Sequence, residues 1–295
     1  MTPDRGLFSP KVSPFSPDMP AKMIDGKAVA SAIAARAKKE CARLGFTPGL
    51  AVILVGGDAA SLMYVGLKEK SCREAGIAFE RLFFKSDAPQ SIVIRAIESL
   101  NRRPDIDAVL VQLPLPAPLD ADAIIRSMAP EKDADGFHPE NVALLLDGAP
   151  RIIPGLAAGI LALAKSTGVP LAGKDALIIA NSPVFFTPVD VVLRSAGVRP
   201  AFAAPDADVA AKARAADLLV VAVGRAGFLT ADMVKPGAIV IDVGTNRVGG
   251  KTVGDVDPAV GGVAGHLTPV PGGVGPVTVA MLIANTIELA KRRRL

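Results

Sequence analysis

The chain has 295 residues, of which none is tryptophan and one is tyrosine, so aromatic side chains make up only 4% of it. This scarcity argues against a nucleic-acid surface built from stacked aromatic rings. Alanine, valine, leucine and isoleucine supply most of the apolar residues, and alanine-rich helical segments alternate with apolar strands. That alternation favours an α/β protein over a β-sandwich.

Cysteine and histidine are also scarce, with two residues of each. Cys41 and Cys72 fall within predicted helices and lack the spacing of metal ligands, so we predict no metal site and a reducing, cytoplasmic location. His138 and His266 have no acid, base or cysteine at an informative spacing. Both histidines are interpreted as structural.

The net charge is +4, and much of the excess is carried by Lys291-Arg292-Arg293-Arg294. These cations end a predicted helix and complement its dipole; since no binding motif accompanies them, we predict no nucleic-acid partner. Residues 258–287 carry no charge, but Gly and Pro interrupt their first half, so we predict no membrane span. Residues 1–21 contain five prolines and predict a disordered tail rather than a signal peptide.

From Met23 onward, helix and strand patterns alternate, which favours parallel sheets with right-handed crossovers. Ser86 and Asp87 are the expected cap of the helix at 90–101, and the helix at 155–167 bridges to a second unit the size of a dinucleotide-binding domain. Helices are predicted at 25–44, 59–75, 90–101, 120–128, 155–167, 188–196, 207–216 and 276–294, and strands at 50–55, 77–84, 108–113, 176–180, 199–204, 218–223 and 238–242.

One face of the helix at 59–75 carries Ser61, Tyr64 and Lys68 at helical spacing. The helix follows a buried strand, and open α/β sheets bind small molecules beyond the carboxyl ends of their strands. Taken alone, the same residues also fit a solvated lysine beside a half-buried packing tyrosine.

Four motifs decide between these interpretations: Ser61-x-x-Tyr64-x-x-x-Lys68, Val111-Gln112-Leu113-Pro114-Leu115-Pro116, Lys132-Asp133-x-Asp135-Gly136-Phe137, and Thr268-Pro269-Val270-Pro271-Gly272-Gly273-Val274-Gly275-Pro276. Through them, the chain from about Met23 to Arg292 resembles the bifunctional methylenetetrahydrofolate dehydrogenase/methenyltetrahydrofolate cyclohydrolase family. The resemblance implies a homodimer and two α/β domains with the active site in the cleft between them. Residues 22–150 with 272–295 would form the folate and catalytic domain, and residues 151–271 a Rossmann-like domain.

The resemblance also implies roles for single residues. Lys68 would be the central catalytic group, Gln112 its contact, Tyr64 the ring that stacks on the aminobenzoyl group of the folate, and Asp135 the residue that holds the pterin. Ser61 and Pro271-Gly272-Gly273 would complete the folate site.

The chemistry of hydrolysis suits these residue types. A lysine with a reference pKa of about 10.4 exchanges protons near neutral pH if burial and a cationic substrate lower its pKa. A neutral glutamine orients the amine without holding it protonated. Two alternatives stay open, namely Gln112 as a strand cap and Asp135 as a turn residue, while Asp133 is interpreted as the acid that stabilises the loop.

The dinucleotide half departs from the family's Gly-Arg-Ser-x-x-Val-Gly-x-Pro pattern, because residues 180–188 read ANSPVFFTP. Phe186 stands for a glycine, which would put a ring where phosphate should lie, but the sequence leaves open whether Phe185 and Phe186 point into the cofactor groove or into the core. Asn181 takes the place of the family's arginine, which binds the 2′-phosphate of NADP. Losing that charge-assisted hydrogen bond costs roughly 1.5–3 kcal/mol of binding free energy, so NADP would bind about 10- to 150-fold more weakly. Asp206, in a second altered patch, would repel phosphate but suits the ribose of NAD.

The sequence therefore predicts an enzyme that hydrolyses 5,10-methenyltetrahydrofolate to 10-formyltetrahydrofolate, with its NADP-dependent dehydrogenase activity impaired or lost. The cofactor contacts that remain would come from Asn181, Ser182, Gly224 and Thr245. One alternative is a fully bifunctional enzyme that uses NADP or NAD through a rebuilt loop. The other is a non-catalytic folate-binding partner subunit.

Overall fold

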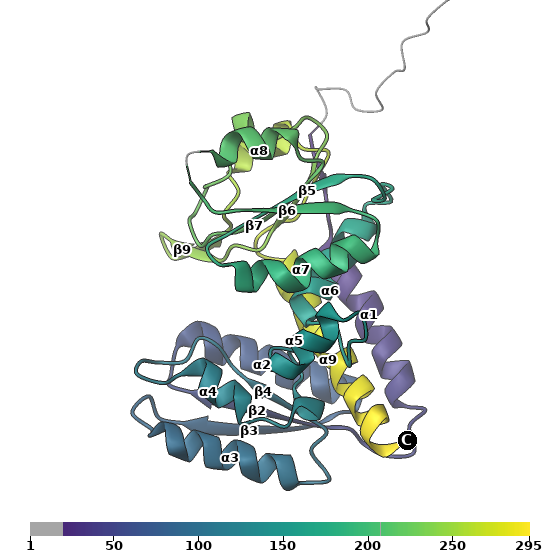
Figure 1. Cartoon of the computed structure of the whole chain (residues 1–295), viewed down its shortest axis with the longest axis vertical. Helices are drawn as coiled ribbons and strands as arrows, with labels where there is room; N and C mark the ends of the chain where they lie inside the picture. Colours follow the sequence, from purple (N-terminus) through teal and green to yellow (C-terminus); the bar gives the residue numbers. More distant parts are fainter. Residues whose placement is uncertain (1–19, 207) are drawn as a thin grey trace, which may run out of the picture.

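The computed structural model describes residues 20–206 and 208–295, so nearly all of the predicted tail at 1–21 lies outside the described residues. Two α/β units are stacked along the long axis of the molecule, and three helices connect them (Figure 1). This arrangement confirms the predicted two-domain α/β fold with parallel sheets.

The first unit contains a three-stranded parallel sheet in the order β3-β2-β4, formed by β2 (Gly49–Val55), β3 (Ala78–Phe84) and β4 (Ala108–Val111). Every residue of β2 is buried, because alternate side chains enter cores on opposite faces of the sheet. Helix α2 (Ala59–Ala75) covers one face and α3 (Gln90–Arg102) the other. The shorter helices α4 (Ala121–Arg126) and α5 (Pro139–Leu146) follow β4.

The second unit contains a six-stranded parallel sheet in the order β1-β11-β8-β7-β5-β6. Its first strand in the chain, β1, precedes the whole first unit in sequence and pairs with β11. Helices α7 (Pro183–Ser195) and α8 (Val209–Ala215) pack on opposite faces. The strands are β1 (Lys22–Met23), β5 (Asp175–Ala180), β6 (Arg199–Ala203), β7 (Leu218–Ala222), β8 (Ile239–Asp242) and β11 (His266–Leu267), and a separate hairpin joins β9 (Asn246–Val248) to β10 (Lys251–Val253).

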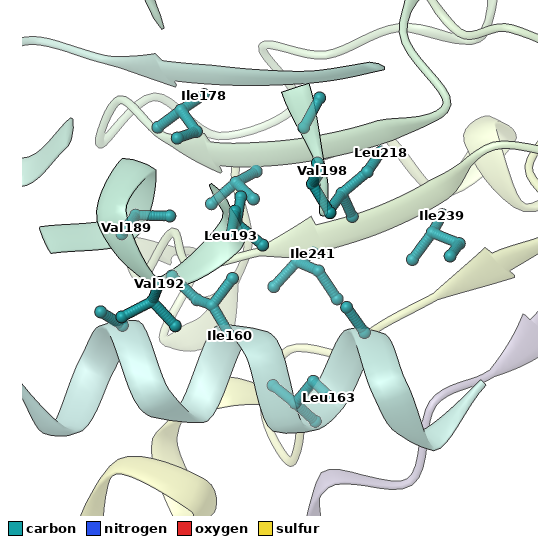
Figure 2. Close-up of a cluster of buried hydrophobic side chains, with 14 of the residues drawn as sticks. Ile160, Leu163, Ile178, Val189, Val192, Leu193, Val198, Leu218, Ile239 and Ile241 are labelled. Atoms are coloured by element: carbon teal, nitrogen blue, oxygen red, sulfur yellow. The ribbon is translucent and has the colours of Figure 1, made fainter. Parts of the chain in front are cut away.

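Helices α1 (Gly26–Cys41), α6 (Gly155–Ser166) and α9 (Val274–Arg294) connect the two units. In Figure 2, Ile160 of α6 points toward the side chains of the second sheet, and Leu163 of the same helix belongs to the same buried cluster. Helix α9 belongs to both cores, because Val277 packs in the core of the second unit and Ile283 and Ile287 pack in that of the first. By length and composition α9 could span a membrane, but 56% of its apolar window is buried inside the protein.

The basic residues at the end of α9 bind acids on the first unit. Asp107 is fully buried, and its carboxylate accepts hydrogen bonds from Gly49 N, from Arg293 Nη1 at 2.9 Å and from Arg294 Nε at 2.7 Å. Lys291 pairs with Glu40 at 2.7 Å. The predicted complement to the helix dipole is therefore only part of their role, because these cations also fasten α9 to the first sheet.

Several predicted boundaries were wrong. The first turn of α3 follows Pro89 with no side-chain cap, so Ser86 and Asp87 do not cap it. Helix α7 begins at Pro183 rather than at Pro188, because proline suits the first helical position, where its missing N–H has no helical acceptor. The short helix α5 and the β9–β10 hairpin had no predicted counterpart, since neither shows an extended hydrophobic period.

Candidate active site

A cavity of about 730 Å³ opens between the two units. Tyr64 of α2 and the Pro271-Gly272-Gly273 turn both line it, together with Thr245. A methyl group at Gly275 would come within 3.7 Å of the Tyr64 hydroxyl, so the turn and the tyrosine are close neighbours. The cleft expected between the domains is therefore present, and predicted folate residues line it.

Lys68 lies one turn after Tyr64 on α2, beside this cavity rather than among its lining residues. Its Nζ donates a hydrogen bond of 2.7 Å to Oε1 of Gln112. The amide of Gln112 is fixed in that orientation because its Nε2 donates to the carbonyl oxygen of Leu113 at 2.7 Å. Gln112 directly follows β4, so a sheet end presents a neutral acceptor to a helix-borne amine.

Burial and charge act against each other at this amine. Partial burial lowers the pKa of Lys68, and the negative charge of Asp135 opposes that shift. Burial raises the pKa of Asp135 to about 6, with Lys68 opposing and Asp133 adding to the rise. Both groups therefore titrate closer to neutrality than free side chains do, as acid–base catalysis near neutral pH requires.

Asp133 organises the loop that carries Asp135. Its carboxylate accepts hydrogen bonds from the backbone of Gly136 at 3.0 Å and of His138 at 2.7 Å, and from Nδ2 of Asn141 at 3.0 Å. The turn chemistry therefore belongs to Asp133, in agreement with its predicted role, and leaves the Asp135 side chain to the site. His138 caps α5 by accepting from the backbone of Glu140, which is the structural role expected of it.

Two other motif residues are buried and make hydrogen bonds within the first unit. Lys132 is 1% exposed and donates to the carbonyl oxygens of Leu100 and Arg103, while burial lowers its pKa to about 8. Ser61 is 5% exposed and bonds Asp58 at the start of α2, where its backbone N–H donates at 2.8 Å. Ser61 does not line the cavity, although the sequence groups it with Tyr64 and Lys68.

On the second unit, two buried carboxylates shape the loops that face the cleft. Asp255 is fully buried and accepts from the backbone of Val223 at 2.6 Å and of Gly224 at 2.9 Å. Asp242 accepts from the backbone of Gly244 and Asp255, and burial raises its pKa to about 6. No pattern considered in the sequence predicted this pair. The available signal was a glycine within two residues of each acid, Gly244 after Asp242 and Gly254 before Asp255, since a methyl group at Gly244 would overlap the carboxylate of Asp255.

The structure decides the direction of Phe186, which the sequence leaves open. Its ring lies 5.6 Å from the ring of Phe202, tilted by 60°, and packs against the core formed by α6, α7 and the sheet. Phe186 points toward the core because it lies within α7 on a side that faces apolar neighbours. Asn181 donates from Nδ2 to the carbonyl oxygen of Val223 at 2.9 Å, which ties the turn after β5 to the end of β7.

These features define a class of protein: a two-domain α/β enzyme whose second domain has the parallel sheet of dinucleotide-binding folds and whose first domain holds a lysine, an amide and an acid together beside the cleft. Two family profiles match the chain. The tetrahydrofolate dehydrogenase/cyclohydrolase catalytic domain matches residues 24–135, and the NAD(P)-binding domain of the same family matches residues 154–294. The chain therefore belongs to the tetrahydrofolate dehydrogenase/cyclohydrolase family, as the sequence resemblance predicted.

Individual relatives agree with this assignment. The bifunctional protein FolD of Acidiphilium cryptum is 45% identical over 279 residues, which cover 94% of this chain and 100% of the relative. The solved bifunctional enzyme FolD of Campylobacter jejuni is 40% identical with a TM-score of 0.88, covering 92% and 99% of the two chains. The Trypanosoma brucei dehydrogenase-cyclohydrolase, solved with NADP and an inhibitor, is 35% identical with a TM-score of 0.87, covering 92% and 98%.

The position of Phe186 leads to a prediction that distinguishes a core residue from a residue that obstructs the nucleotide site. Phe186→Ala should lower the free energy of unfolding by roughly 1–3 kcal/mol, because a half-buried ring is lost, and should leave nucleotide affinity unchanged. Urea denaturation followed by circular dichroism and calorimetric titration with NADP measure the two effects. Phe137→Ala, at a ring that is 40% exposed, is the control for stability. A clear gain in NADP affinity on removing the ring would mean that Phe186 obstructs the site.

Proposed function

We propose that the chain is a working bifunctional enzyme that oxidises 5,10-methylenetetrahydrofolate and hydrolyses 5,10-methenyltetrahydrofolate. The observation that carries the hydrolase is the Lys68 amine held 2.7 Å from the neutral amide of Gln112, beside Asp135. This differs from the leading prediction of an impaired dehydrogenase. The bifunctional alternative is supported by relatives at 45% identity and by the core position of Phe186.

The folate would lie along the cleft with its aminobenzoyl ring on Tyr64. Asp135 would accept hydrogen bonds from the amino-pyrimidinone edge of the pterin, because a carboxylate presents two acceptors side by side. Pro271, Gly272 and Gly273 would form the facing wall. Gly273 suits this position, since a methyl group there would be within 2.8 Å of Thr268 and too close for the turn to keep its shape.

Hydrolysis begins with water adding to the cationic carbon that bridges N5 and N10. The Lys68 amine, in its neutral form, takes a proton from that water as the C–O bond forms. The bond from this carbon to N5 then breaks, N5 receives a proton, and the carbonyl of the 10-formyl group forms, so one proton is released overall. Gln112 orients the amine by accepting from it, and its neutrality keeps the amine free to gain and lose a proton.

The second unit would bind the nucleotide at the carboxyl ends of β5 and β7, where open α/β sheets bind such ligands. Asn181 and Ser182 form the turn that leads directly into α7, and the backbone N–H groups that follow Pro183 would face a pyrophosphate. Gly224 and Thr245 would contact the rest of the nucleotide from the loops that Asp255 and Asp242 hold. When bound, NADP or NAD supplies the acceptor for the hydride that leaves the methylene carbon.

The hydrolase mechanism predicts opposite pH shifts for two substitutions. Gln112→Glu places a negative charge on the amine and raises the pKa of Lys68, so the rising limb of kcat against pH should move to higher pH. Asp135→Asn removes a negative charge that favours the protonated amine, so the limb should move to lower pH, with a higher KM for the folate. Loss of methenyltetrahydrofolate absorbance measures both.

Lys68→Ala is the control and should hydrolyse no faster than buffer. Shifts of the same sign for Gln112→Glu and Asp135→Asn would contradict the assignment of the limb to Lys68. A wild-type protein that hydrolyses no faster than buffer would leave the folate-binding partner subunit as the remaining interpretation.

The dehydrogenase half is tested by supplying 5,10-methylenetetrahydrofolate with NADP or with NAD and recording the reduced nicotinamide. We expect turnover with at least one nucleotide, abolished when the folate is omitted. The cyclohydrolase assay on the same preparation is the control for folded protein. Hydrolysis without any reduction of the nucleotide would instead support the impaired dehydrogenase that the sequence predicted.

We also propose a homodimer, formed through strand β3. This strand is the edge of the first sheet, has no strand partner on its outer side within residues 20–206 and 208–295, and exposes 53% of Phe83. Open apolar edges pair readily with a second copy. Sedimentation velocity should give a dimer that Phe83→Lys shifts toward monomer, while Leu146→Lys, at a side chain that is 58% exposed, leaves it dimeric. A monomeric wild-type protein would end this proposal.

A cytoplasmic location fits the same function. Cys41 and Cys72 are free, buried thiols, which suits a reducing compartment.

A further inference from the structure

Arg225 spans the place where the nucleotide of the proposed dehydrogenase would bind. It lies in the loop after β7, and its Nη2 donates a hydrogen bond of 3.1 Å to the carbonyl oxygen of Pro205 in the loop after β6. The strand order β7-β5-β6 puts β5 between these two strands. The guanidinium therefore connects two loops across the end of β5, above the turn that leads into α7.

The guanidinium is also held in a fixed plane. Its Cζ lies 4.4 Å from the centroid of the Phe228 ring, a stacking arrangement that a lysine would not reproduce. Arg225 is exposed, and within residues 20–206 and 208–295 it forms no ion pair with a carboxylate at 4.0 Å or less. The structure thus keeps an oriented guanidinium, without a carboxylate partner among the described residues, between the loops after β6 and β7.

Asp206 directly follows Pro205, the residue that Arg225 contacts. In dinucleotide-binding folds, an acid at the end of the second strand hydrogen-bonds the 2′-hydroxyl of the adenosine ribose in NAD, and a nearby arginine accommodates the 2′-phosphate of NADP. The turn residue Asn181 carries no charge, and its amide is engaged with Val223. Of the side chains named at this edge, Arg225 is the one that carries a positive charge and can bind a phosphate.

We propose that Arg225 binds the 2′-phosphate of NADP and that Asp206 favours NAD over NADP. The two residues together set the nucleotide preference. The expected change in kcat/KM rests on the proposed dehydrogenase activity, whereas the expected change in nucleotide binding does not. Planar guanidinium groups bind phosphate through two parallel N–H bonds, and the contact to Pro205 leaves donors for such a pair.

The experiment compares NADP with NAD in the dehydrogenase assay for three variants. Arg225→Gln should lower the ratio of kcat/KM for NADP to that for NAD by about 10- to 100-fold, mostly through the KM for NADP. Asp206→Asn should raise the same ratio. Arg214→Gln is the matched control and should keep it, because Arg214 is an exposed arginine of the same unit that also donates to a backbone carbonyl, that of Asp232 at 3.2 Å.

Calorimetric titration with 2′,5′-ADP and with 5′-AMP separates this proposal from the dehydrogenase itself. Arg225→Gln should weaken 2′,5′-ADP and leave 5′-AMP unchanged, whether or not the protein turns over methylenetetrahydrofolate. Equal losses for both nucleotides would show that Arg225 only holds the two loops together, and unchanged binding of both would show that it contacts neither. Either result overturns the proposal.

Discussion

The burial of helix α9 in both hydrophobic cores is the constraint on which the cleft depends. One end of this continuous helix packs against the second sheet and the other against the first, so the units do not move apart without exposing Val277 or Ile283. The Pro271-Gly272-Gly273 turn leads directly into the first residues of α9, so the packing of α9 also fixes the position of the turn. Tyr64 and this turn line the same cavity as close neighbours because a shared core fixes the distance between them.

Within that frame, the chemistry of the site depends on the positive charge of Lys68 being only partly compensated by its neighbours. A carboxylate in contact with Lys68 would keep it protonated, and a fully apolar pocket would keep it neutral. Gln112 supplies a hydrogen bond without charge, and Asp135 supplies charge that its own burial weakens. On the second unit the carboxylates of Asp242 and Asp255 have a different role, since both accept hydrogen bonds from backbone N–H groups and hold the loops that follow the strands.

The sequence predicted most of the fold because its elements have strong periods and clear ends. The helix at 59–75 was predicted at its observed bounds, and the motif spacing led to Lys68, Gln112 and Asp135. The dinucleotide side was harder to predict. Phe186 was interpreted by comparison with a glycine in an extended loop, whereas its direction is set by its place in a helix that begins five residues earlier than expected. The Asp242–Asp255 pair joins loops distant in sequence, and such contacts leave no local period.

The ion pairs of Asp107 have a consequence for the order of synthesis. Arg293 is separated from Asp107 by 186 residues, so at about 5–20 residues per second the ribosome adds it roughly 10 to 40 seconds after the acid. Throughout that interval Asp107 has its hydrogen bond from Gly49 within reach but not its two arginine partners. The contacts that complete the first unit at the start of β4 therefore form only after the second unit has been translated.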